Sequence, residues 1–405
     1  MNFRIDQIPA RSVLRTVAAW LMAGAAPAYA VCPATNQFNF TFATATAATL
    51  DYAGTYSYTA TNGLGQNQAI GVSFISNGLS SSIAGGQQMP AITTLINDGG
   101  TTNRNLVIGG IFTGRTADVA VNTRVAVIVF TFATPIRDFS VQVNDVDFTT
   151  NQFRDWLQIT GVNGAASYVP SLTTPFGQSN ATGGTRTNAS SSQALGATTT
   201  PVTINSSQSV GTGASGNNAN TGTITGSFIQ PVTRIEVRYG NYPLQTGETA
   251  TGQQAIGIQA ISFCPMPQLT FAKSSTPFIT AAADPRRFNA PGSDVVYSLT
   301  LTNSNSSPID LNQVVLTDPL PAQVSFFNGD IDDAGALTTN YEFVPGTSGL
   351  TFAAGNLTYS NNGGTSYVYN PATGYDPLVT AIRLNPQGTM AANSSFTLRF
   401  RTRIK

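Results

Sequence analysis

The chain has 405 residues, of which 41% are apolar and 9% charged, and its 19 basic side chains balance 19 acidic ones. This balance provides no general electrostatic attraction to nucleic acid, so we expect no nucleic-acid partner. The sequence contains no histidine, which excludes Ser-His and Cys-His nucleophiles and His-ligated zinc or iron.

The N-terminal segment predicts a cleavable signal peptide over residues 1–30. Three arginines precede an apolar run from Val17 to Ala25, and the segment ends in Ala28-Tyr29-Ala30. This order is typical of secretory signals. A lipidated Cys32 is the alternative, but Val31 stands where lipoprotein signals place a small residue. We expect export to the medium or the cell surface, and no transmembrane segment in the mature chain because no other apolar run reaches about 18 residues.

The two cysteines, Cys32 and Cys264, are expected to form a disulfide, since an even pair in an exported chain is usually oxidised. Pro265-Met266-Pro267 follows at once and cannot continue a strand ladder. We therefore predict a first domain over 31–264 and a second over 268–405.

The first domain alternates apolar and polar residues with a period of two, as strands do. The run from Val125 to Phe132 is apolar on both faces and predicts a central strand. Gly-, Pro- and Asn-rich turns separate the strands, so we expect an all-β, jelly-roll-like sandwich. The polar segment 171–222 predicts a long surface excursion, either a binding loop or a variable insertion. The other clear strands lie near Phe38–Phe42, Phe139–Val143, Ile224–Phe228, Ile235–Tyr239 and Ala255–Phe263.

The second domain predicts an immunoglobulin-like sandwich, because seven or eight short alternating strands fit into it. Arg399, Arg401 and Arg403 alternate with apolar residues on its last strand. Such a row either docks an acidic polymer or protects an exposed sheet edge, and the second interpretation is favoured. The expected strands lie near 268–274, 293–303, 311–317, 323–327, 341–344, 356–360, 378–384 and 394–404.

The second domain also resembles a known family. Lys273-Ser274, Ser293-Asp294, Thr302-Asn303 and the corner Val314–Pro321 match the pattern of the conserved-repeat immunoglobulin-like domain of bacterial surface proteins, domain of unknown function 11. The resemblance implies a spacer or adhesion scaffold without known catalytic residues. The first domain resembles, more loosely, sandwich domains that precede such repeats in secreted bacterial proteins.

The best candidate for a site is the acidic run Asn144, Asp145 and Asp147, with Asp155 nearby. If the preceding strand continues, Asp145 and Asp147 share its core-facing side, about 7 Å apart. Carboxylates and amides there predict structural Ca²⁺. Alternatively, a bulge or the end of the strand turns the acids to solvent, or they cap turn amides, and this interpretation is favoured. A glycosidase-type acid pair is the least favoured interpretation.

Four aromatic residues, Trp156, Tyr168, Tyr239 and Tyr242, have two interpretations. As exposed platforms they would stack on sugar rings, but aromatic residues in a β-sandwich are more often part of the core.

We therefore expect a secreted or cell-surface, non-catalytic protein that acts as an adhesive or structural module. Its expected partner is a surface glycan or an extracellular protein, bound through the first domain. The alternatives are a purely structural surface or matrix component and a polysaccharide-active enzyme.

Overall fold

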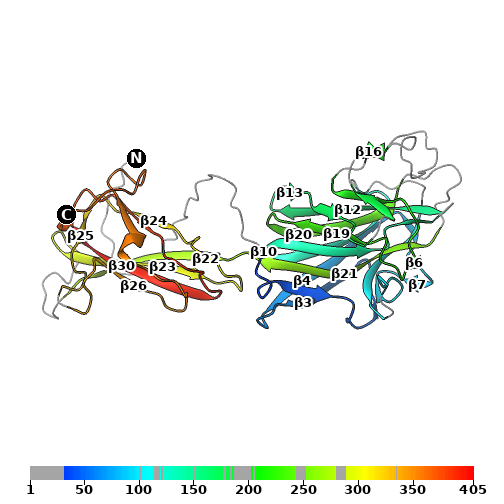
Figure 1. Ribbon diagram of the computed structural model, residues 1–405, viewed down its shortest axis with the longest axis horizontal. Helices are drawn as coiled ribbons and strands as arrows, with labels where there is room; N and C mark the ends of the chain where they lie inside the picture. The colour runs from blue at the N-terminus through cyan, green and yellow to red at the C-terminus, as the bar shows by residue number, and fades with distance from the viewer. Residues whose placement is uncertain are drawn as a thin grey trace. The chain divides into compact units, whose positions relative to one another are not determined.

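The computed structural model describes residues 32–99, 102–113, 119, 122–149, 152–176, 179–182, 185–186, 202–203, 206–242, 252–279, 289–333 and 335–405. The predicted signal peptide over residues 1–30 and its cleavage point lie outside these residues, as does most of 187–205. The chain divides into two compact units, Val31–Met266 and Pro267–Lys405. Both are built from antiparallel strands, which confirms the all-β class (Figure 1).

The first unit is organised around one long strand, β10 (Val125–Asn144), as Figure 1 shows. The other strands of this unit are β1 (Phe38–Thr41), β2 (Ala48–Thr49), β3 (Thr55–Thr61), β4 (Asn67–Asn77), β5 (Leu79–Ser81), β6 (Ile83–Ala84), β7 (Gln87–Gln88), β8 (Ala91–Thr93), β9 (Asn105–Phe112), β11 (Phe148–Thr149), β12 (Phe153–Asn163), β13 (Ala166–Tyr168), β14 (Ser171–Thr173), β15 (Asn180–Thr182), β16 (Thr185–Arg186), β17 (Val202–Thr203), β18 (Gln208–Gly211), β19 (Ile224–Phe228), β20 (Val232–Asn241) and β21 (Gln254–Pro265).

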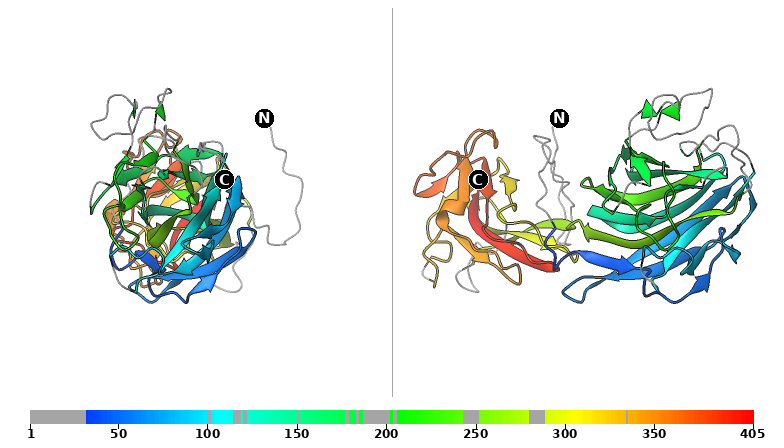
Figure 2. Two further views of the ribbon diagram at one scale, coloured as in Figure 1. Left: turned by 90° about the vertical axis from the view of Figure 1, so that its right-hand side faces the viewer. Right: turned by 45° about the vertical axis from the view of Figure 1, so that its right-hand side comes forward.

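β10 belongs to both layers of the sandwich. Its first half, Val125–Thr131, pairs with β4 and β20, and its second half, from Ile136 to Asn144, pairs with β21 and β19. The register of the β10–β20 ladder shifts between Thr131 and Ile136. Pro135 lies in this interval and has no backbone N–H to donate to the ladder. The pairings β10–β4–β3–β1–β21–β10 close a circuit around the core. Figure 2 shows the strands of this unit from two further sides.

The core lies between these layers and is rich in aromatic rings. Phe139 of β10 packs against Phe130 and Phe228, with ring centroids 6.4 and 6.3 Å apart. Val125, Val127 and Val129 face the other way and pack with Trp156. The first half of β10 is thus buried on both faces, which confirms the prediction of a central strand. Cys32 and Cys264 form the predicted disulfide.

The polar segment 171–222 is only partly a surface excursion. Within it, β18 pairs with β12, and all four residues of β18 are buried. The expectation that this segment buries little is wrong for β18, because Val210 covers the valine face of β10. Ser209 and Gln208 are buried along with it.

The second unit is a two-layer sandwich. A six-stranded sheet contains β22 (Leu269–Pro277), β23 (Asp294–Asn303), β25 (Val324–Asn328), β26 (Tyr341–Val344), β28 (Gly374–Asp376) and β30 (Ser394–Ile404). A three-stranded sheet contains β24 (Leu316–Pro319), β27 (Leu357–Ser360) and β29 (Ala381–Leu384), with the short 3-10 turn η1 (Ala354–Asn356) before β27. Leu299, Phe326 and Leu398 of the first sheet share a core with Ile382 of the second. Lys273 joins the layers through an ion pair with Asp318, 2.7 Å long.

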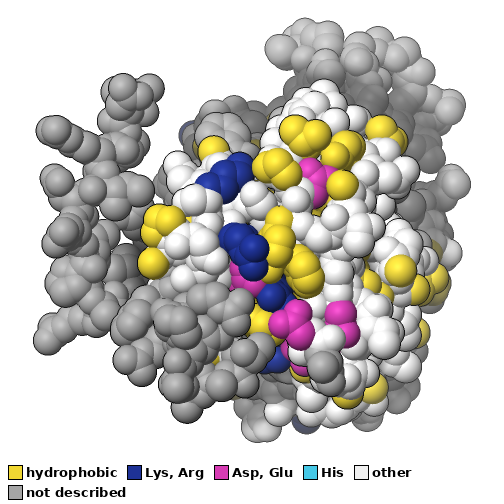
Figure 3. All heavy atoms as spheres, turned by 90° about the vertical axis from the view of Figure 1, so that its left-hand side faces the viewer, with side chains coloured by type: hydrophobic (Ala, Val, Ile, Leu, Met, Phe, Trp, Pro, Cys, Tyr) yellow, Lys and Arg dark blue, Asp and Glu magenta, His cyan; other side chains and the backbone are white. Residues whose placement is uncertain are grey.

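The arginine row on β30 does not protect an exposed edge, and that prediction is wrong. β30 pairs with β23 on one side and with β25 and β26 on the other. Arg401 and Arg403 bind Asp294, and Arg399 forms an ion pair with Glu342. Figure 3 shows basic side chains of one face of this unit lying beside acidic and apolar ones.

Candidate functional site

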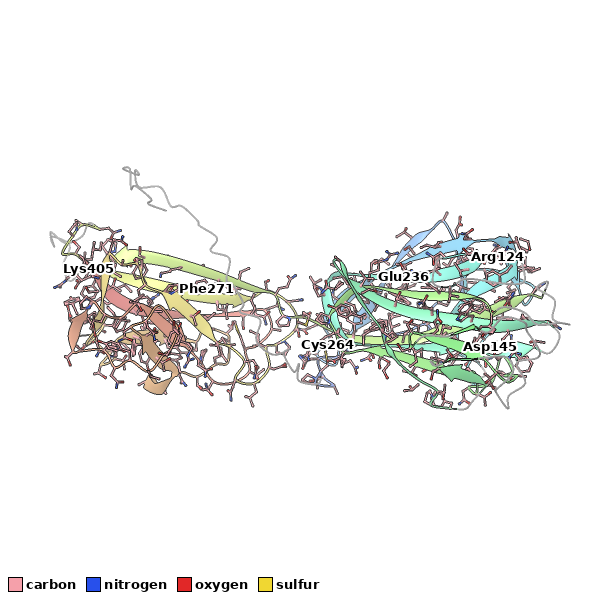
Figure 4. All side chains as sticks on the ribbon, turned by 90° about the horizontal axis from the view of Figure 1, so that it is seen from above. Arg124, Asp145, Glu236, Cys264, Phe271 and Lys405 are labelled. Atoms are coloured by element: carbon pink, nitrogen blue, oxygen red, sulfur yellow. A yellow bond between two sulfur atoms is a disulfide. The ribbon has the colours of Figure 1, made fainter. Side chains whose placement is uncertain are left out.

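The acidic run lies at the end of β10, at the end of the first unit opposite Cys264 (Figure 4). β10 ends at Asn144 because Asp145 adopts a left-handed conformation, with φ of 67°. Asp tolerates this region better than most residues. The chain then turns, so the predicted extension of the strand through Asp147 does not occur.

A second segment, residues 211–222, wraps around the acidic run. The Val146 amide donates to the Gly222 carbonyl at 2.9 Å. The Ser215 amide donates to Asp147 Oδ2 at 2.6 Å. A Cβ at Gly211 would come within 1.7 Å of the Asp147 carbonyl oxygen, so only glycine fits there. These contacts fix the backbone of Asp147 and the direction of its carboxylate.

Asp155 on β12 meets the acidic run from the other side. The Asp147 amide donates to Asp155 Oδ2 at 3.1 Å, and the Asp155 amide donates to the Asp147 carbonyl at 2.9 Å. The Tyr239 hydroxyl, from β20, donates to Asp155 Oδ1 at 2.6 Å. The turn after β10, the start of β12 and the distant strand β20 therefore meet at one group of carboxylates.

All three carboxylates are enclosed: the exposed fractions of Asp145, Asp147 and Asp155 are 8%, 6% and 0%. The alternative that the acids face solvent is therefore wrong, whereas its other form, that they cap turn amides, agrees with the hydrogen bond from the Ser215 amide to Asp147. No lysine or arginine in the described part of the chain forms an ion pair with them. Burying carboxylates without an opposite charge strongly favours their neutral form or a bound cation.

The pKa values follow from this burial. Burial, and then repulsion by Asp147, raises the pKa of Asp145 to about 8. Burial raises the pKa of Asp147 to about 6, although the hydrogen bond from the Ser215 amide acts in the opposite direction. Burial and the charge of Asp147 raise the pKa of Asp155 well above its ordinary value. The Tyr239 hydroxyl has a raised pKa for the same reason, burial beside Asp155.

The structure does not leave the predicted ligand Asn144 free for a metal. Its Oδ1 accepts hydrogen bonds from Thr223 at 3.0 Å and from Gln142 at 3.2 Å, and its amide donates to Asn105 at 3.1 Å. Sequence reasoning missed Asn241, which pairs with Asp155 across β12 and β20. The sequence offered one indication of it: Asn241 is two residues after Tyr239 at the end of a strand, so both side chains lie on the same face. Within the described ranges, no three Asp, Glu, His or Cys side chains are grouped so as to hold a metal ion by themselves.

The four aromatic residues are placed mostly in the core. Tyr239 and Tyr242 are fully buried and Trp156 nearly so, with Trp156 and Tyr242 in contact edge to face at 5.3 Å. Tyr168 is half-buried against the main core. This favours the core interpretation for the first three and leaves Tyr168 as the one that a ligand can reach.

A shallow hollow of about 490 Å³ lies elsewhere on this unit, between β10, β14 and the end of β19. Ser140, Ser171 and Ser227 line it together with two exposed apolar side chains, Val169 and Ile229. Polar groups beside apolar side chains are the usual surroundings of a bound sugar or peptide.

Comparison with known proteins adds no family. No protein-family model matches the chain, and no curated protein matches it.

In the described part of the chain, there is no helix with the length and apolar character needed to cross a membrane.

Proposed function

We propose that this chain is a secreted or cell-surface, non-catalytic protein that acts as a structural or adhesive module. The observation that carries the proposal is the enclosure of the acidic group: the side chains of Asp145, Asp147 and Asp155 are almost completely buried. A glycosidase needs two carboxylates that flank a substrate in an open cleft. The polysaccharide-active alternative is therefore the weakest.

Export is supported by the disulfide, because such bonds persist mainly in oxidising compartments. The Lys273–Asp318 ion pair joins two of the positions on which the resemblance to the surface-protein immunoglobulin-like domains rests. We propose that the second unit is a domain of this kind and acts as a scaffold.

If the protein is adhesive, we propose that its contact surface is the hollow beside β14 and β19. Ile229 is 71% exposed and Val169 54%, and both line this one hollow. A glycan or extended peptide lying there would cover both residues and meet the serine hydroxyls. A purely structural role remains the alternative, in which no soluble ligand binds.

We expect Ile229→Asp to weaken binding to immobilised glycans about tenfold or more, because covering an Ile side chain contributes about 1.5–3 kcal/mol. The probe is a broad glycan array, and the protein is the chain from Val31 onward. Leu64→Asp is the matched control, since Leu64 is also exposed in this unit but does not line the hollow. Absence of saturable binding by the unmodified chain would contradict the adhesive form, whereas equal loss in both variants would contradict the location.

A further inference from the structure

The acidic group contains one buried carboxylate oxygen without a hydrogen-bond partner. Asp145 Oδ1 is buried and accepts no hydrogen bond. Asp147 Oδ2 and both oxygens of Asp155 do accept one each. An unpartnered buried acceptor is costly, and the cost is larger when the group is charged. Asp145, in the turn that also carries Asp147, therefore presents a buried oxygen that no protein donor satisfies.

A second residue without hydrogen-bond partners, Asn241, lies next to the acidic group. It is fully buried, and neither its side-chain oxygen nor its nitrogen has a hydrogen-bond partner. Asn241 lies directly opposite Asp155 in the antiparallel ladder of β12 and β20. Residues paired in this way project from the same face of the sheet, with their Cβ atoms about 5 Å apart. An amide without hydrogen-bond partners thus lies beside Asp155, which in turn accepts a hydrogen bond from the Asp147 amide.

We propose that this cluster is a calcium site, with Asp145 and Asp147 as carboxylate ligands and the Asn241 amide oxygen as a third. Asp155, held by the Tyr239 hydroxyl and the Asp147 amide, positions Asp147 and adds negative charge.

The chemistry of the available donors favours calcium over other ions. All of them are oxygens, so soft metals that prefer sulfur or imidazole are not favoured. Calcium takes six to eight oxygens from carboxylates, amides, backbone carbonyls and water, in flexible geometry. The site therefore does not need three grouped carboxylates, and the described residues contain no such group. Magnesium demands a strict octahedron at shorter distances, which a cluster assembled from a turn and two strands suits less well.

The ion would hold together the turn after β10 and the ends of β12 and β20. Calcium sites in extracellular modules bind with dissociation constants of about 10⁻⁴–10⁻³ M. At calcium concentrations about a hundredfold above this constant, binding should raise the unfolding midpoint of the first unit by about 5 °C or more.

The test compares thermal unfolding in CaCl₂ and in chelator, using the chain from Val31 onward and following Trp156 fluorescence. We expect a calcium-dependent rise in the original chain and in Asp51→Asn, an exposed acid of the same unit. Asp145→Asn should abolish the rise and be about as stable as the original chain in chelator, because Asn has the same shape and Asp145 Oδ1 accepts no hydrogen bond that the change would break. The same rise in Asp145→Asn would overturn the assignment.

A second measurement on the unmodified chain does not depend on how any variant folds. Terbium(III) occupies calcium sites and emits when a nearby aromatic ring transfers energy to it. Tyr239, whose hydroxyl binds Asp155, supplies such a ring. Sensitised emission that calcium displaces with a stoichiometry of about one would support the site. No emission, together with no heat of calcium binding in titration calorimetry, would overturn it.

Discussion

Removing the Cys32–Cys264 disulfide is expected to lower the free energy of unfolding of the first unit by up to about 5 kcal/mol. The bond links residues 232 positions apart and ties β21, where Cys264 lies, to the chain just before β1. In the chain-entropy model, a link that closes so long a loop restricts the unfolded state most strongly. Both cysteines are buried, so the bond is also shielded from reductants.

The chain itself allows this effect to be assigned to one unit. Trp156 is the only tryptophan from Val31 onward, and it is buried in the first unit. The double variant Cys32→Ser, Cys264→Ser should unfold at lower urea by Trp156 fluorescence. The transition of the second unit, followed by circular dichroism, should stay where it is. An unchanged Trp156 transition would show that the bond contributes little beyond the packing around it.

Much of the fold is readable from hydrophobic periodicity. Val125–Phe132 is apolar at every position except Thr131, and a strand of that kind must be covered on both faces. The structure covers one face with the aromatic core and the other with Trp156 and Val210. The strands of the second unit follow alternation in the same way, as Val295, Leu299 and Leu301 show.

The parts that sequence reasoning missed depend on tertiary contacts. β18 is polar, and nothing in Gln208–Gly211 predicts burial; it is buried because β12 offers it a free edge. The turn at Asp145 changes the face of every later residue, and a sequence cannot show where one left-handed residue falls. For that reason the sequence drew attention to Asp145, Asp147 and Asp155, although the strand extension expected to align the first two does not occur. Their amide neighbour Asn241 was not predicted. Asn144 has hydrogen-bond partners, and Asn241 has none.

The arginine row on β30 shows that the sequence pattern does not reveal strand order. Alternation places Arg399, Arg401 and Arg403 on one face of β30, but it does not show whether the strand is central. In the structure Arg401 stacks on Phe278 and Phe327, 3.8 and 4.5 Å from the ring centroids. Strand order, which sets the partners of these cations, is a long-range property of the whole domain.

The strand order of the larger sheet also sets the partners of Asp294, whose removal is the second substitution with a large expected effect. Asp294 begins β23, and its carboxylate accepts from Arg401 Nε at 2.9 Å, from Arg403 Nε at 2.7 Å and from the Tyr375 hydroxyl. These residues belong to β30 and β28, so one carboxylate joins three strands of the larger sheet. Arg401 and Asp294 are almost completely buried. Removing one member of a buried charge group leaves the others uncompensated.

We expect Asp294→Asn to lower the free energy of unfolding of the second unit by about 3–5 kcal/mol. Glu342→Gln, on β26 of the same sheet, is the matched control: it breaks the exposed pair with Arg399 and should cost less than about 1 kcal/mol. Urea unfolding followed by circular dichroism measures both, and Trp156 fluorescence should report an unchanged first unit. Equal effects of the two substitutions would contradict the central role of Asp294.

The pH dependence of the stability difference between the original chain and Asp294→Asn distinguishes loss of charge from loss of packing. Burial raises the pKa of Asp294, but hydrogen bonds from Arg403, Tyr375 and Arg401 outweigh it, so the pKa is lower in the folded chain than in the unfolded one. A carboxylate of this kind stabilises the fold above its unfolded pKa of about 3.9 and loses that contribution as the pH falls through its folded pKa. The stability difference between the original chain and Asp294→Asn should therefore be largest near neutral pH and shrink below about pH 4. A difference that stays constant down to acid pH would mean that Asp294 acts through its shape and neutral hydrogen bonds, and not through its charge.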